Sequence, residues 1–151
     1  MTPLFNKLNL KDKKSIVVVN APESFDAELK ALKGVEVSRN IGAGDKYAFG
    51  MAFVMTQKQL DAASIALTAM ADGDAILWMV YPKATSKRYK CEFNRDSAWS
   101  TLGQAGFEPV RQVAIDEDWS ALRFRRIEFI KSFTRAAERA LTQAGKLRAA
   151  K

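Results

Sequence analysis

Three stretches of the chain, residues 15–20, 47–55 and 75–81, are apolar at almost every position. A strand with one face in water alternates apolar and polar side chains, whereas a strand covered on both faces is apolar throughout. We therefore expect these stretches to be buried strands with helices packed on both faces of their sheet. Continuous apolar strands are typical of a mostly parallel sheet, so the pattern places the chain in the α/β class.

Helix signals fall between the expected strands. Ser24 can cap a first helix, which follows the first apolar stretch. Thr56 and Gln59 form a capping box that opens a second helix, and residues 72–73 close it. Asp96 can cap a third helix. The alternation of strands and helices favours parallel strands joined by crossover connections.

The sequence contains three further strand candidates. Residues 35–39 alternate as an edge-like strand, and residues 107–115 and 119–127 are joined by the short turn 116–118, which predicts an antiparallel hairpin. The link 40–46 is shorter than a parallel crossover normally requires. Either this link crosses without a helix, or the preceding strand lies at an edge with irregular geometry. The expected architecture is a three-layer α/β sandwich whose mostly parallel sheet ends in an antiparallel hairpin.

The charge of the chain is concentrated in its last residues. Residues 1–130 are long enough for one domain with a substantial core. Residues 131–151 hold six basic residues against one acid, which is +5 of the formal +7, and are expected to form a basic, alanine-rich helical tail. Such a tail can contact nucleic acid weakly, with Arg135 and Arg139 as candidate contacts, or remain a solvated helix.

Two residue counts exclude whole classes of chemistry. The chain has no histidine, which excludes Ser/His/Asp and Cys/His catalysis and histidine-dependent zinc sites. Its single cysteine excludes internal disulfides and thiolate zinc sites, so no metal site is expected. No apolar run approaches the roughly 20 residues of a membrane span, and the first residues lack the core of a signal peptide. We expect a cytoplasmic protein with no membrane contact.

Four short motifs carry a resemblance. They are residues 8–11, the turn 20–23, Trp78 with the sequence Tyr81-Pro82-Lys83, and Asp116 with residues 119–124. On these motifs the chain resembles a small bacterial family of domains of unknown function that have a reduced Rossmann-like fold of the class I methyltransferase kind. The resemblance covers residues 4–126. It implies a three-layer Rossmann-like sandwich for residues 1–130, and it implies no activity.

The chain departs from the cofactor-binding pattern of methyltransferases. In that superfamily a glycine-rich turn after the first strand lets the backbone approach the cofactor, and an acid ending the second strand holds the ribose hydroxyls. Here the turn 20–24 contains no glycine, and residues 38–40 contain no acid. The sequence therefore disfavours binding of S-adenosylmethionine or a dinucleotide, and we assign neither a cofactor nor a catalytic residue.

A ligand site is nevertheless expected at the strand ends. In a doubly wound sheet, ligands bind beyond the carboxyl ends of the strands, where the winding direction changes. We predict a site made by Asn20, Glu23, Thr56, Tyr81 and Lys83. Glu23 and Lys83 are candidates to clamp a small anionic ligand or to move a proton, with Asn20 and Thr56 as hydrogen-bond donors. In the alternative interpretation, these residues only shape turns, support helix ends or face solvent.

Other motifs give less specific signals. Residues 42–46 resemble a phosphate loop but precede a strand, whereas phosphate loops open a helix. Cys91 lies among basic residues, and without a histidine base it is expected to be redox-sensitive at most. The turn 116–118 clusters carboxylates that point apart rather than enclosing a metal. Arg123 and Arg125 lie on a basic strand that can meet phosphates or face solvent.

We therefore expect a non-catalytic or small-ligand-binding Rossmann-like domain rather than an enzyme. Two alternatives stay open. One is a degenerate methyltransferase-like enzyme or nucleotide binder that recognises its nucleotide without the glycine turn. The other is a nucleic-acid-associated module that uses the basic tail together with Arg123 and Arg125.

Overall fold

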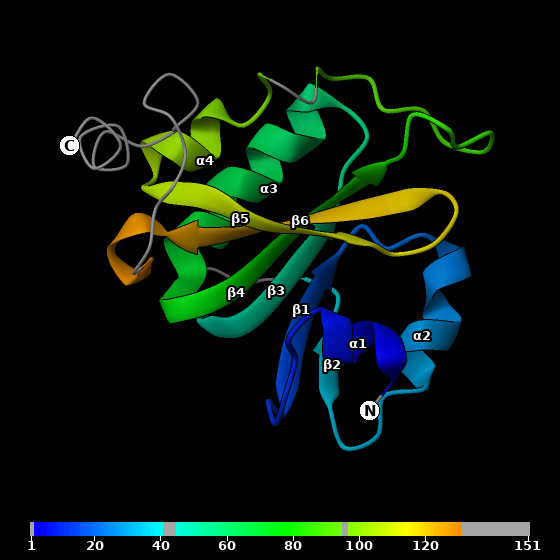
Figure 1. Ribbon diagram of the computed structural model, residues 1–151. Coiled ribbons are helices and arrows are strands. Elements are labelled where there is room, and N and C mark those ends of the chain that lie inside the picture. Colours follow the sequence, from blue (N-terminus) through cyan, green and yellow to red (C-terminus); the bar gives the residue numbers. More distant parts are fainter. Residues whose placement is uncertain (1, 41–44, 95–96, 131–151) are drawn as a thin grey trace.

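A computed structural model of the chain describes residues 2–40, 45–94 and 97–130 (Figure 1). The described strands are β1 (Ser15–Val19), β2 (Glu36–Ser38), β3 (Tyr47–Phe53), β4 (Ala71–Pro82), β5 (Phe107–Ala114) and β6 (Trp119–Arg126). The described helices are α1 (Pro3–Lys7), α2 (Asp26–Lys30), α3 (Gln57–Met70) and α4 (Ser100–Gln104), with 3-10 turns at Glu23–Phe25 and Ile127–Phe129. None of these helices is long and apolar enough to cross a bilayer.

The strands form one sheet in the order β2-β1-β3-β4-β6-β5. Strand β1 is parallel to both β2 and β3, and β3 is parallel to β4, whereas β6 is antiparallel to both β4 and β5. The expected α/β class, the mostly parallel sheet and the closing hairpin are confirmed. Strand β2 is three residues long and lies at the edge, which agrees with the second interpretation of the short link 40–46.

Two apolar cores lie on opposite faces of the sheet. Helices α1 and α2 cover one face, where Phe5 and Leu29 pack with Ile16 and Trp78. Helices α3 and α4 cover the other face (Figure 1). The indole Nε1 of Trp78, fully buried in β4, donates to the carbonyl oxygen of Leu8 at 2.9 Å. This bond joins the middle of the sheet to the segment that follows α1.

Several local expectations need correction. Ser24 does not cap a helix. It lies inside the 3-10 turn Glu23–Phe25, whose N-cap residue is Pro22 and which has no side-chain cap hydrogen bond. Helix α2 follows this turn directly. Residues 72–73 belong to β4, which begins at Ala71 directly after α3. The capping box of Thr56 and Gln59 is confirmed. The expected cap at Asp96 and the tail 131–151 lie outside the described residues.

The expected burial of β1 on both faces is confirmed on one face only. Ile16 and Val18 are buried beneath α1 and α2, but Val17 and Val19, on the opposite face, are half-buried. Helix α3 packs mainly against β3 and β4, and Val17 and Val19 pack only partly against the core beneath it. Strand β1 therefore keeps a partly uncovered apolar side beside α3.

Tyr47 links β3 to α3, and its ionisation makes the free energy of unfolding fall at alkaline pH. The side chain is buried, and its hydroxyl donates to the carbonyl oxygen of Leu67 at 2.6 Å. Burial raises the pKa of Tyr47 well above its usual range, against a smaller lowering effect of Arg126. The folded-state pKa lies above the unfolded value of about 10. The contribution of the neutral Tyr47 side chain to the free energy of unfolding is therefore complete below about pH 10 and is lost at higher pH.

We expect Tyr47→Phe to lower the free energy of unfolding by about 1 kcal/mol at pH 7, because the hydrogen bond is lost. Above about pH 10 the difference should shrink, since only the wild-type chain has to keep this buried phenol neutral. Urea unfolding of both proteins at pH 7 and at about pH 11 measures the difference. A stability difference between the two proteins that is the same at both pH values would contradict a raised pKa of the buried Tyr47 phenol.

Candidate functional site

A pocket of about 480 Å³ lies between the carboxyl ends of β1 and β2 and one side of α3. We call it the β1–α3 pocket. It is lined by Val19, Asn20, Asn40, Lys58, Gln59, Ala62, Ala63, Ala66 and Leu67. The chain passes from β1 outward to β2 and then returns past β1 to β3, so the winding direction changes at β1. The pocket therefore lies where ligands bind in open α/β sheets.

Asn20 shapes the turn after β1. Its φ angle is +61°, in the left-handed region that favours glycine, and among other residues asparagine adopts this region most readily. The turn thus reaches a glycine-like backbone conformation without a glycine. The prediction of Asn20 as a site residue agrees with its place in the pocket lining, although its role in binding stays a prediction.

Substitutions at Asn20 separate backbone conformation from side-chain chemistry. We expect Asn20→Ala to lower the free energy of unfolding by about 1–2 kcal/mol, because alanine is strained at this φ angle. Asn20→Gly should stay within about 0.5 kcal/mol of the wild type, because glycine adopts this conformation without a steric cost. Thermal or urea unfolding of the two variants makes the comparison. Equal destabilisation of both would show that the amide, not the backbone, stabilises the turn.

The first turn of α3 is held rigidly beside the pocket. The Thr56 hydroxyl accepts from the backbone N–H of Gln59 at 3.1 Å. The Gln59 side-chain oxygen Oε1 in turn accepts from the backbone N–H groups of Met55 and Thr56, at 2.8 and 3.2 Å. The predicted site residue Thr56 thus uses its oxygen to cap the helix. Gln59 lines the pocket instead; the sequence placed it only in the capping box, and that position at the start of α3 was a signal that could have pointed to it.

The sequence did not single out the other walls of the pocket. Asn40 follows β2, where methyltransferases carry an acid, and Lys58 is an exposed residue in the first turn of α3. Ala62 and Ala66 form a small-residue side of α3 that leaves the cavity open. In the sequence these alanines have the pattern of an ordinary amphipathic helix, so no signal distinguished them from core residues.

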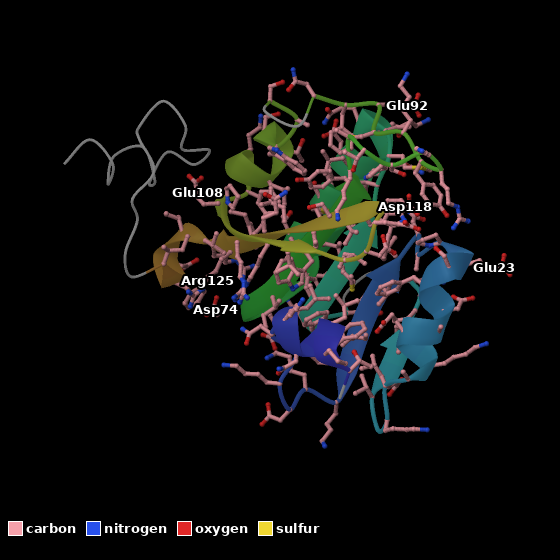
Figure 2. The ribbon with its side chains drawn as sticks, turned by 45° about the vertical axis from the view of Figure 1, so that its right-hand side comes forward. Glu23, Asp74, Glu92, Glu108, Asp118 and Arg125 are labelled. Atoms are coloured by element: carbon pink, nitrogen blue, oxygen red, sulfur yellow. The ribbon has the colours of Figure 1, made fainter. Side chains whose placement is uncertain are left out.

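The other predicted site residues lie elsewhere. Glu23 is exposed in the turn before α2, at the outer margin of the molecule in Figure 2. Tyr81 is buried at the end of β4, where its hydroxyl accepts from Gln112 Nε2 at 3.1 Å. Within the described part of the chain, no ion pair joins Glu23 to Lys83. Neither they nor Tyr81 line the β1–α3 pocket, and their functional roles stay predictions.

Lys83 belongs to a second pocket. A cavity of about 420 Å³ lies in the loop after β4 and is lined by Lys83, Ala84, Ser86, Lys87, Arg88, Tyr89, Lys90 and Cys91. We call it the basic loop pocket. It lies beyond the carboxyl end of β4, on the edge of the sheet that also carries the β1–α3 pocket.

The candidate nucleic-acid contacts are only partly described. Arg125 forms two hydrogen bonds with the carboxylate of Asp74, at 2.8 and 2.6 Å, and the two side chains lie together in Figure 2. Arg123 is half-buried, and burial lowers the pKa of its guanidinium. Arg135 and Arg139 lie outside the described residues. The prediction of nucleic-acid contact stays untested.

Solved methyltransferases are similar to this chain over most of their lengths. One from Aquifex aeolicus, dependent on S-adenosylmethionine, has a TM-score of 0.55 at 12% identity over 82% of this chain and 88% of that chain. The N-methyltransferase NodS from Bradyrhizobium japonicum WM9, in complex with S-adenosyl-L-homocysteine, has a TM-score of 0.52 at 12% identity over 83% and 89%. The chain has the Rossmann-like methyltransferase fold. A magnesium protoporphyrin IX methyltransferase from Synechocystis PCC 6803 has a TM-score of 0.52 at 14% identity, over 82% and 74%.

These similarities correct the functional expectation. No family model and no curated protein matches the sequence. The expected non-catalytic domain was wrong, as was the expectation that the chain is not an enzyme, because the solved proteins that share the methyltransferase fold are enzymes. The alternative of a methyltransferase-like enzyme is favoured. Asn20 takes a backbone conformation that a glycine would supply, so the missing glycine does not by itself prevent that turn from forming.

Proposed function

We propose that this chain is an S-adenosylmethionine-dependent methyltransferase that holds the nucleoside part of its cofactor in the β1–α3 pocket. The observation that carries the proposal is the position of that pocket at the carboxyl end of β1, where the sheet changes its winding direction. The methyltransferase fold supports the same assignment. The proposal also includes membership of the small bacterial family that the sequence resembles, and a cytoplasmic location for the protein.

The residues of the pocket fit such a cofactor. An apolar surface formed by Val19, Ala62 and Ala66 suits a purine ring, and a volume of about 480 Å³ is within the range of small-molecule sites. The side-chain amides of Asn20 and Asn40 would each offer a donor and an acceptor to the ribose hydroxyls. Asn40 would thus replace the acid found in other methyltransferases, with a neutral amide in place of a carboxylate.

The chemistry of the reaction would come from the cofactor, and the chain would position the reactants. When bound, S-adenosylmethionine supplies a methyl group: a lone pair of the acceptor forms the new bond to carbon, and the electrons of the broken C–S bond stay on sulfur. The capping box of Thr56 and Gln59 would keep the start of α3 in place beside the reacting groups.

Isothermal titration calorimetry of the full chain with S-adenosylhomocysteine tests the proposal. This probe is the inert product form of the cofactor, and we expect saturable binding at one site, with a rise in melting temperature at excess ligand. Titration with ATP serves as the control for a general nucleotide binder. The absence of saturable heat with both S-adenosylhomocysteine and S-adenosylmethionine would overturn the proposal. Binding of ATP alone would favour the nucleotide binder instead.

A further inference from the structure

The loop that forms the basic loop pocket is firmly attached to the sheet. The backbone N–H of Lys83 donates to the carbonyl oxygen of Asp118 at 2.8 Å. The Ser86 hydroxyl donates to the carboxylate of Asp118 at 2.8 Å and accepts from the backbone N–H of Tyr89 at 3.1 Å. The Tyr89 ring packs on the buried Trp119, with ring centroids 4.8 Å apart. These contacts hold the walls of the pocket in a fixed arrangement.

The pocket carries an excess of positive charge. Residues 83–91 include four basic side chains, those of Lys83, Lys87, Arg88 and Lys90, and no acid. Among the described residues, none of the four forms an ion pair with a carboxylate. The carboxylate of Asp118 accepts from Ser86 of this loop, and Glu92 follows the loop, so the four basic residues and these two acids together carry a net charge of +2. Clustered like charges repel one another, so a bound anion would relieve that repulsion.

A short chain of hydrogen bonds connects the two pockets. Gln59, in the wall of the β1–α3 pocket, accepts from the backbone N–H of Met55 at 2.8 Å. The carbonyl oxygen of Met55 accepts from the backbone N–H of Glu92 at 2.7 Å. Glu92 directly follows Cys91, which lines the basic loop pocket. The two pockets thus flank the junction between β3 and α3, as sites for two reactants would.

We infer that the basic loop pocket binds a small molecule that carries a phosphate group, and that this molecule is the methyl acceptor. The second part rests on the proposed methyltransferase function. Lysine ammonium groups bind phosphate as point charges, and the guanidinium of Arg88 can bind two phosphate oxygens at once. A cavity of about 420 Å³ suits a small molecule. The loop would hold the phosphate, the acceptor's lone pair would form the bond to the methyl carbon as the C–S bond breaks with its electron pair on sulfur, and any proton released would go to solvent.

Calorimetric titration of the full chain with inorganic pyrophosphate tests the site. The loop variant carries Lys87→Gln, Arg88→Gln and Lys90→Gln, three exposed positions at which the fold should tolerate the change. The charge-matched control is a separate variant that carries Lys13→Gln, Lys14→Gln and Lys33→Gln and leaves the loop unchanged. These three lysines line a different pocket, beside the amino end of β1. Both variants lose three positive charges, so a difference between them reports position rather than net charge.

We expect saturable binding of pyrophosphate that the loop variant weakens by at least about tenfold and the control by less than about twofold. Equal weakening in both variants, or no saturation, would overturn the site in favour of diffuse charge attraction. Saturable binding of a single-stranded oligonucleotide, but not of pyrophosphate, would overturn it in favour of nucleic acid.

A titration in the presence of saturating S-adenosylhomocysteine tests the acceptor role, because a methyl acceptor must bind beside the cofactor. We expect pyrophosphate affinity to change by less than about threefold. Mutual exclusion of the two ligands would overturn the acceptor role. If S-adenosylhomocysteine does not bind at all while pyrophosphate does, the proposed function fails and the phosphate site stands.

Discussion

Replacement of Ala62 by tryptophan is expected to weaken binding of S-adenosylhomocysteine by at least about a hundredfold, which corresponds to about 2.7 kcal/mol. Ala62 lines the β1–α3 pocket and is exposed, so an indole can enter the cavity without displacing the core. The side chain would occupy the space that we assign to the purine ring. Calorimetry with purified Ala62→Trp, whose folding is checked by circular dichroism, measures the loss.

The same helix offers a matched control. Ala69 is also an exposed alanine inside α3, but it does not line the pocket. Ala69→Trp makes the same chemical change and carries the same cost in helix propensity, and it should leave the affinity within about twofold of the wild type. If Ala62→Trp binds S-adenosylhomocysteine as tightly as Ala69→Trp does, the cofactor does not occupy this pocket.

Truncation of Trp78 is expected to have the largest effect on stability. The side chain is fully buried in the middle of the sheet, and its Nε1 donates to Leu8. We expect Trp78→Ala to lower the free energy of unfolding by about 3–5 kcal/mol, because it leaves a large cavity. The unpaired carbonyl oxygen of Leu8 adds to this loss. Urea unfolding followed by far-UV circular dichroism measures the change.

A second substitution keeps this prediction testable if the alanine variant does not fold. Trp78→Phe retains an aromatic ring but removes the Nε1–H donor, and we expect a loss of about 1–3 kcal/mol. Ile65 provides the comparison, because it is 64% exposed on α3, and Ile65→Ala should change stability by less than about 0.5 kcal/mol. A Trp78→Phe protein as stable as the wild type would show that the hydrogen bond to Leu8 contributes nothing.

Most of the fold could be predicted because its strongest signals are local. The continuous apolar stretches indicated the central strands, and the capping box placed the start of α3. The partial exposure of one side of β1 could not be predicted, because the apolar character of Val17 and Val19 does not reveal how far a helix covers them. The same apolar pattern fits a core residue and the floor of a pocket.

The candidate site could be predicted only where the chain itself makes a turn. Asn20 was found from its position after the first strand, and it lines the β1–α3 pocket. Tyr81 and Lys83 were grouped with it because parallel strands end at one edge of a sheet, but that edge carries two pockets rather than one. Ala62 and Ala66 were missed, since only the packing of α3 beside β1 turns small side chains into the wall of a cavity.

The two outer strands of the sheet bear on how the protein behaves at high concentration. The edge strand β2 spans only Glu36–Ser38, which gives another chain few backbone groups to pair with. At the opposite edge, β5 contains Pro109, which has no N–H to donate, and its register with β6 shifts between Pro109 and Arg111. Short length, proline and local irregularity are features by which natural sheets avoid adding a further strand. Neither edge is therefore a good template for self-association or for growth into fibrils.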